Sequence, residues 1–349
     1  MNTSTSSAPI SARWVILPGL VEPEGLMIES GPVDAPGPGQ LLVAVEATGI
    51  SYAEQAMRRG RYFGQPEFPF VPGYDLVGTV LQTGPQADTS LAGKRVAVLT
   101  KTGGWASHAV VEARDTVIVP AGIDPADAET VVVNGLTAWQ MLHRAARVKP
   151  GQTILVHGAS GGVGGVLIQL AQHARIRVIG AASPRNHDAL RAAGVEPVDY
   201  HDPKLADRVR ELSPRGVDAV FDNIGGPMMR VSYGLLAPRG AYVCYAIIAG
   251  VSGTGGLVMP FVKALSRVLL WNALPNGHRV KFYDLWAGHK SRPARFRKHL
   301  EEDLGHVFTL LADGSLKANI AARFPLDDVA AALTLAESRT VNGKIILLP

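Results

Sequence analysis

The stretch His157-Gly158-Ala159-Ser160-Gly161-Gly162-Val163-Gly164 decides the fold of this chain. An apolar run over residues 153–157 leads into it, and residues 163–174 follow with a helical pattern. Its three spaced glycines therefore lie between a buried strand and a helix, although the spacing is G-x-x-G-x-x-G rather than G-x-G-x-x-G. A helix N-terminus presents N–H groups and a favourable dipole to an anion, and glycine lets the anion approach. We therefore predict a dinucleotide pyrophosphate site with contacts at Gly158, Ser160, Gly161, Gly162, Val163 and Gly164.

The sequence around this turn predicts an α/β protein with two domains, as the length of 349 residues also suggests. The first 130 residues contain short β segments separated by Gly and Pro, for example at 41–45, 78–81 and 95–99. After Asn134, apolar strands alternate with helices, which is typical of a parallel, doubly wound Rossmann sheet. We predict a mainly β domain over residues 1–133, a Rossmann domain over 134–285 and a segment over 286–349 that returns to the first domain.

Composition limits the function classes. Hydrophobic residues make up 47% and charged residues 18% of the chain, which indicates a globular protein. The net charge of +4 suits an anionic ligand but is too small and too dispersed for a nucleic-acid surface. The single cysteine, Cys244, allows no internal disulfide and fits a reducing compartment. With neither a signal peptide pattern nor an 18-residue apolar window, we expect a cytoplasmic protein without stable membrane insertion.

The strand after the turn selects the nicotinamide cofactor. An NAD site usually carries Asp or Glu about 20 residues beyond the turn, where it binds the ribose hydroxyls. Residues 177–185 contain no acid, and Ser183 and Arg185 stand at their end. An arginine attracts a 2′-phosphate that a carboxylate would repel. We therefore predict that the cofactor is NADPH, with Ser183 and Arg185 in contact with it; the alternative for Arg185 is a solvent-facing helix start.

Six segments together resemble the medium-chain dehydrogenase/reductase superfamily, and most closely its zinc-independent quinone oxidoreductase branch. They are Gly49–Tyr62, Pro72–Gly78, Asn134–Trp139, the Ser160–Gly164 turn, Asp222–Gly226 and Asn342–Lys344. The resemblance runs over nearly the whole chain in the family's order. It implies a GroES-like catalytic domain, a Rossmann domain and a homodimer.

The resemblance also bears on metal. Zinc-dependent members of the superfamily carry Cys or His where this chain has Ser51, and Gly-His-Glu where it has Gly73-Tyr74-Asp75. Serine and tyrosine are poor zinc ligands. The four-cysteine lobe of the structural zinc has no counterpart either. We therefore expect no metal.

Family-like positions imply further cofactor contacts, namely Asn134, Thr137, Tyr200, Asn223, Tyr245 and Asn342. A cap or turn role remains the alternative for Thr137 and Asn223, and simple packing remains the alternative for Tyr200 and Tyr245. Asn342 stands in the segment that commonly closes over the nicotinamide.

Ser51 and Tyr62 resemble catalytic positions on the acceptor side. Tyr62 matches the place where enoyl-thioester reductases of the superfamily carry a proton-donating tyrosine, although a half-buried packing role is its alternative. Quinone reductases often have a tyrosine where this chain has Ala56, which suggests a wider or more apolar pocket. The predicted substrate pocket comprises Tyr52, Ala56 and Trp271.

The long stretch over residues 250–290 contains an expected helix with Phe261, Leu265, Val268 and Leu269 on one face. A core or dimer-facing helix is the favoured interpretation, and a pocket wall or a membrane-surface contact are the alternatives. For the chain as a whole we expect an NADPH-dependent reductase of a quinone-like small molecule. A reductase of activated C=C bonds (enals, enones or enoyl thioesters) and a non-catalytic NADPH-binding protein are the alternatives.

Overall fold

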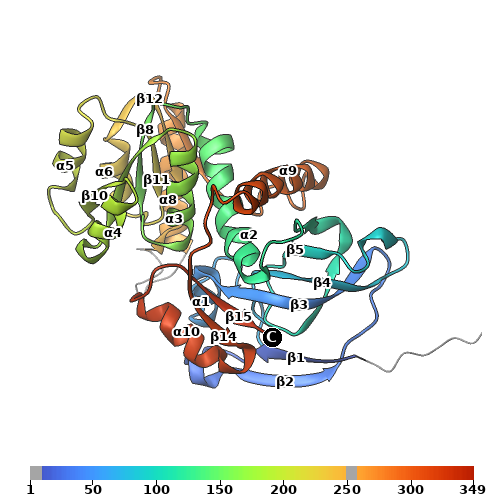
Figure 1. The fold of residues 1–349 in the computed structure, drawn as a ribbon. Helices are drawn as coiled ribbons and strands as arrows, with labels where there is room; N and C mark the ends of the chain where they lie inside the picture. The colour runs from blue at the N-terminus through green and yellow to red at the C-terminus, as the bar shows by residue number, and fades with distance from the viewer. Residues whose placement is uncertain (1–9, 249–257) are drawn as a thin grey trace, which may run out of the picture. The chain divides into compact units, whose positions relative to one another are not determined.

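The computed structural model describes residues 10–248 and 258–349, which form two compact units. The first unit comprises residues up to 60, 64–133 and 320–349, and the second comprises residues 61–63 and 134–319. The division after Val133 falls inside helix α2 (Pro125–Trp139). Each unit is built around its own sheet, as Figure 1 shows.

The first unit is the mainly β, GroES-like domain that the sequence predicts. Its larger sheet has the strand order β14-β15-β3-β4-β5-β7, and β6 also pairs with β3. These strands are β3 (Gln40–Ile50), β4 (Asp75–Thr83), β5 (Arg95–Leu99), β6 (His108–Glu112), β7 (Thr116–Ile118), β14 (Ile320–Pro325) and β15 (Lys344–Leu348). A separate antiparallel pair consists of β1 (Ser11–Ile16) and β2 (Met27–Pro32). The short β segments expected at 41–45, 78–81 and 95–99 lie in β3, β4 and β5.

Strand periodicity explains the core of this unit. Leu41, Val43 and Val45 alternate along β3 and so point to one face of the sheet, where they meet Leu76 and Val80 of β4. The helices α1 (Tyr52–Arg58) and α10 (Val329–Ser338) also belong to this unit. Strand β15 pairs with β3, so the end of the chain completes the sheet that its first part begins.

The second unit is a doubly wound Rossmann domain. Its parallel sheet has the strand order β10-β9-β8-β11-β12-β13. The strands are β8 (Thr153–His157), β9 (Arg177–Ala182), β10 (Glu196–Asp199), β11 (Val217–Asp222), β12 (Leu236–Cys244) and β13 (Arg279–Phe282). The order reverses between β8 and β11, and ligands of such sheets bind at the carboxyl ends of the strands beside that reversal.

Helices lie on both faces of this sheet (Figure 1). They include α3 (Gly162–His173), α4 (His187–Ala192), α5 (Leu205–Leu212), α6 (Met228–Tyr233) and α8 (Val258–Ala273). The second unit also contains α9 (Pro293–Ala312). Strands β8, β9 and β11 are almost continuously buried, as expected for a sheet that is covered on both sides.

Helix α9 belongs to the second unit, whereas the sequence pattern predicts that residues 286–349 return to the first. The buried carboxylate of Asp303 explains the difference, because it accepts hydrogen bonds from Gln140 and Arg144 of the second unit. The backbone N–H of Lys317 also donates to the side chain of Gln169 on α3. The return to the first unit therefore begins with Ile320, at β14.

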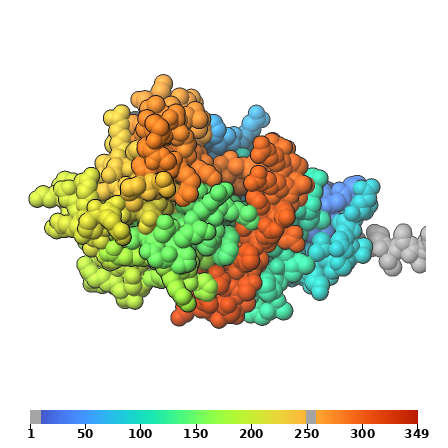
Figure 2. Space-filling model, turned by 90° about the horizontal axis from the view of Figure 1, so that it is seen from above, coloured from blue at the N-terminus to red at the C-terminus, as the bar shows by residue number. Residues whose placement is uncertain are grey.

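The face expected on helix α8 is only partly right. Val268 is buried together with Ala264 and Trp271, but Leu265 and Leu269 are exposed. Figure 2 shows this helix, in orange, at the surface of the second unit. Residues 250–257 of the stretch discussed above lie outside the described residues. No helix within residues 10–248 and 258–349 is both long and apolar enough to cross a membrane.

Candidate cofactor site

The glycine-rich turn connects β8 to α3 at the carboxyl edge of the Rossmann sheet. Gly158 has a φ of +63°, a left-handed conformation that favours glycine. The N–H of Gly161 donates to the carbonyl of Gly158 at 2.9 Å, which closes the turn. Gly161 is the N-cap of α3, and no side chain caps the helix there. The first N–H groups of α3 are therefore available to an anion.

Close packing fixes the glycines of the turn. A Cβ on Gly164 would lie 2.2 Å from the carbonyl oxygen of Gly158, and one on Gly158 would lie 2.5 Å from the amide nitrogen of Asn223. A Cβ on Gly162 would lie 2.7 Å from the amide nitrogen of Asn134. The structure thus brings two predicted contact residues, Asn134 and Asn223, to the turn.

Asn223 follows β11 at the point where the strand order reverses. Its side-chain oxygen Oδ1 is buried and has no hydrogen-bond partner among the described residues. The neighbouring carboxylate of Asp222 is fully engaged, since it accepts from the backbone N–H groups of Ile224 and Gly225 and from the Tyr242 hydroxyl. A buried acceptor without a partner is costly unless a ligand supplies a donor.

Two more predicted residues lie near the carboxyl ends of the sheet. The Tyr245 hydroxyl donates to the carbonyl of His157 at 3.5 Å, so it contacts the last residue of β8. Thr137 is buried on α2. Burial raises the pKa of the Tyr283 phenol, and the hydrogen bond between Tyr283 and Thr137 partly offsets that rise. Tyr283 also donates to Gln140.

Asn186 was not predicted from the sequence as a site residue. Its amide donates to the Ser160 hydroxyl at 2.9 Å, and its side chain is buried. Asn186 ends the short 3-10 helix Pro184–Asn186, which follows β9 and begins after Ser183. This bond orients Ser160 in the turn and ties the turn to the segment that carries Ser183 and Arg185. Arg185 itself is exposed.

The remaining predicted contacts are peripheral within their own units. Tyr200 follows the edge strand β10, is 38% exposed, and packs its ring on His201. Asn342 is exposed two residues before β15, in the first unit.

On the acceptor side, the segment 61–63 carries Tyr62 in a half-buried position. The next residue, Phe63, stacks on Phe261 of α8 with ring centroids 4.3 Å apart, and Phe261 meets Phe282 edge-on. Trp271, predicted to line the substrate pocket, instead packs in the core on Tyr233 and Tyr242. Phe261 lies ten residues earlier on the same helix and is the aromatic residue beside the Tyr62 segment.

The predicted acceptor-side residues of the first unit, Ser51, Tyr52 and Ala56, lie at one short helix, α1. Ser51 is the N-cap of α1 and forms a capping box with Glu54. Tyr52 is half-buried and Ala56 is buried within α1, so Ala56 packs in the protein rather than presenting an open surface.

Two family models match the chain. One, described as the alcohol dehydrogenase GroES-like domain, covers residues 37–121, and the other, described as a zinc-binding dehydrogenase, covers residues 194–347. The human synaptic vesicle membrane protein VAT-1 homolog is 32% identical over 348 residues, which is 97% of this chain and 86% of that protein. The chain belongs to the medium-chain dehydrogenase/reductase superfamily. Within it, the chain falls in the zinc-independent, quinone oxidoreductase-like branch.

Two further proteins are similar to this chain over nearly its whole length. A 2-haloacrylate reductase from a Burkholderia species is 28% identical over 341 residues, which is 94% of this chain and 96% of that protein. The crystal structure of Escherichia coli quinone oxidoreductase complexed with NADPH superimposes with a TM-score of 0.82 at 25% identity and covers 97% of this chain and 100% of that one.

The positions that hold zinc in other superfamily members form a hydrogen-bonded network here. The buried carboxylate of Glu54 accepts from the backbone N–H and the hydroxyl of Ser51 and, at 2.7 Å, from the backbone N–H of Tyr74. Burial raises the pKa of Glu54, and the Ser51 hydrogen bond partly offsets that shift. Within the described residues, no three His, Cys, Asp or Glu side chains are grouped so that they could hold a metal ion. Ser51 and Tyr74 are thus engaged with a carboxylate.

Proposed function

We propose that this superfamily member is an NADPH-dependent oxidoreductase that reduces a quinone-like acceptor. The observation that carries the proposal is the uncapped N-terminus of α3 at a turn where extra side-chain atoms would collide with the backbone or with Asn223. Such a site fits the pyrophosphate of a dinucleotide. The NADPH-bound quinone oxidoreductase supports the choice of cofactor, since it aligns over nearly the full length of both chains.

The segment after β9 supports NADPH over NADH. In this proposal Ser183 and the exposed guanidinium of Arg185 bind the 2′-phosphate, and Asn186 orients Ser160 toward the pyrophosphate. No carboxylate stands among residues 177–185 to repel that phosphate. The amides of Asn134 and Asn223 flank the turn and offer polar contacts to the same ligand.

When bound, NADPH supplies a hydride to the acceptor. The protein's part is to position the acceptor and to provide one proton for each hydride that is transferred. For a quinone acceptor that proton comes from water or from the nearby Tyr62 hydroxyl. The stacked rings of Phe63 and Phe261 supply an aromatic surface next to Tyr62, which suits a flat quinone.

The second candidate function is the reduction of an activated C=C bond. The 2-haloacrylate reductase favours it, since this chain covers 96% of that relative's length. In that reaction the hydride adds to one alkene carbon and a proton to the other. The Tyr62 hydroxyl would then act directly as general acid on the acceptor.

The test follows NADPH absorbance with 1,4-quinones, 2-alkenals, 2-haloacrylates and enoyl thioesters in parallel. We expect turnover with quinones, and Tyr62→Phe to slow alkene reduction by at least tenfold while largely sparing quinone reduction, since a quinone takes its proton readily from water. Turnover with alkenes alone would select the second function. NADPH binding without oxidation by any acceptor class would contradict both and support a non-catalytic role.

A further inference from the structure

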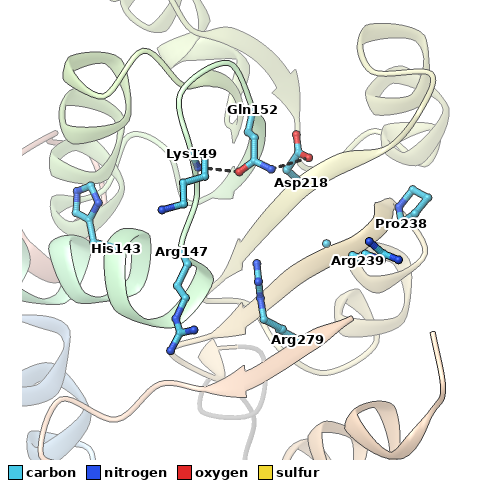
Figure 3. Close-up of a pocket in the computed structure, with 9 residues that line it drawn as sticks. His143, Arg147, Lys149, Gln152, Asp218, Pro238, Arg239 and Arg279 are labelled. Carbon is cyan, nitrogen blue, oxygen red and sulfur yellow. Dashed lines mark hydrogen bonds between the residues drawn. The ribbon is translucent and has the colours of Figure 1, made fainter. Parts of the chain in front are cut away.

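A basic pocket of about 570 Å³ opens at the amino-terminal edge of the Rossmann sheet. It lies wholly within the second unit. Figure 3 shows its lining residues, which are His143, Arg147, Lys149, Gln152, Asp218, Pro238, Arg239, Gly240 and Arg279. The cations come from three separate places: the segment after α2, the start of β12 and the start of β13.

The charges of the pocket are strongly unbalanced. The lining contains three arginines and one lysine but a single carboxylate, that of Asp218. Both oxygens of Asp218 are already engaged, one with the side chain of Gln152 and the other with the backbone N–H of Thr153. Within the described residues, none of the four cations forms an ion pair with Asp218 or with any other carboxylate. One donor of Arg279 bonds to the carbonyl of Ala146, and its other donors remain for a ligand.

Two of the arginines occupy unfavourable backbone conformations. Arg147 has a φ of 55° and Arg239 has a φ of 62°, in the left-handed region where glycine or asparagine is easier to accommodate. Burial, followed by the positive charges of Arg147 and Arg279, lowers the pKa of Lys281 on β13. The cations of this region are therefore close enough to repel one another.

The pocket is distinct from the proposed cofactor site. Gln152 and Asp218 lie at the amino ends of β8 and β11, whereas the glycine turn follows the carboxyl end of β8. The five residues of β8 separate the two edges by roughly 16 Å, at about 3.3 Å for each residue.

We propose that this pocket binds a small polyanion that carries several phosphate groups. Guanidinium groups match phosphate oxygens in pairs, and the cations that line the cavity come from one connecting segment and two strands. The volume lies within the range of small-ligand sites. This binding goes beyond the proposed reductase function and does not depend on it.

The experiment titrates sodium tripolyphosphate into NADPH-saturated protein by calorimetry at 150 mM salt. We expect saturable binding to the native chain. Arg147→Gly and Arg239→Gly should each weaken it at least fivefold, while the thermal midpoint stays equal or rises, because glycine relieves the left-handed backbone. ATP is titrated in the same way. An affinity for ATP equal to that for tripolyphosphate would show that the phosphates alone are recognised, and a higher affinity for ATP would show that the nucleoside also contributes. Both outcomes support the pocket.

Arg175→Gly is the matched control. Arg175 is an exposed arginine of the same unit with a φ of 56°, and it does not line the pocket. This variant loses the same charge and gains the same backbone relief, so we expect its affinity for tripolyphosphate to stay within twofold of native. Three results would overturn the proposal: no saturable binding, equal weakening by Arg175→Gly, or binding that appears only when NADPH is absent. NADPH affinity is measured separately, so failure of the polyanion proposal can be distinguished from failure of the reductase proposal.

Discussion

Arg185 offers a direct test of cofactor choice at the scale of a single residue. Its exposed side chain follows β9, in a segment without carboxylates. We expect Arg185→Ala to weaken NADPH by at least tenfold and NADH by less than twofold, because only NADPH carries the 2′-phosphate. Fluorescence titration of both cofactors gives the two ratios. Equal weakening of both would contradict the assignment of Arg185.

Local sequence was sufficient to predict the turn but not its supporting contacts. Strand, glycines and helix are adjacent in the chain, so residues 157–164 carry their own signal. The bond from Asn186 to Ser160 crosses 26 residues, and no short pattern encodes it. Trp271 was expected in the pocket because the stretch over residues 250–290 was considered as a pocket wall, whereas its helix places it in the core beside Tyr233.

At the scale of elements, a buried charge cluster connects β4, α2 and β15. The Lys344 ammonium lies 2.7 Å from Asp75 and 2.6 Å from Glu129, and all three side chains are buried. Two carboxylates therefore share one cation. Burial, followed by the charge of Asp75, raises the pKa of Glu129 well above its ordinary value of 4.5, and Lys344 only partly offsets this.

This cluster predicts a pH dependence of stability. Above pH 4.5 the unfolded chain has an ionised Glu129 while the folded chain keeps the proton, so folding takes up a proton. The contribution to stability is complete below the unfolded pKa and is lost as the pH rises through the folded pKa. The loss is at most about 1.4 kcal/mol per pH unit.

Urea unfolding between pH 5 and pH 8 measures this contribution. We expect the free energy of unfolding of the native chain, relative to that of Glu129→Gln, to fall as the pH rises, because the glutamine cannot ionise. Glu211→Gln, at an exposed position on α5, is the control and should give a flat difference. A flat difference for Glu129→Gln as well would contradict a retained proton in the cluster.

The elements themselves were largely predictable, because strand and helix periodicities are local. The apolar run over 153–157 and the helical pattern over 163–174 appear as β8 and α3. The unit to which α9 belongs was not predictable, since the Asp303–Arg144 pair connects residues 159 positions apart. The face of α8 was misjudged because an apolar helical stripe does not reveal which of its members find a neighbour.

At the scale of the whole molecule, two opposite edges of the Rossmann sheet carry the two proposed anion-binding sites. The carboxyl edge carries the glycine turn and the buried acceptor of Asn223, and the amino edge carries the basic pocket. The modest net charge of +4 conceals this concentration of cations, which is why composition alone excluded a nucleic-acid surface but could not locate the pocket.

NADPH affinity of two neighbouring glycine variants tests the central claim most directly. A Cβ at Gly164 would meet the Gly158 carbonyl at 2.2 Å, whereas one at Gly165 would have nothing within 4 Å. We expect Gly164→Ala to weaken NADPH by at least tenfold, because the turn must shift. Gly165→Ala should bind normally and gain roughly 0.5–1 kcal/mol of stability, as alanine does in a helix. Equal NADPH affinity for the native chain and the folded Gly164→Ala variant would contradict binding at this turn.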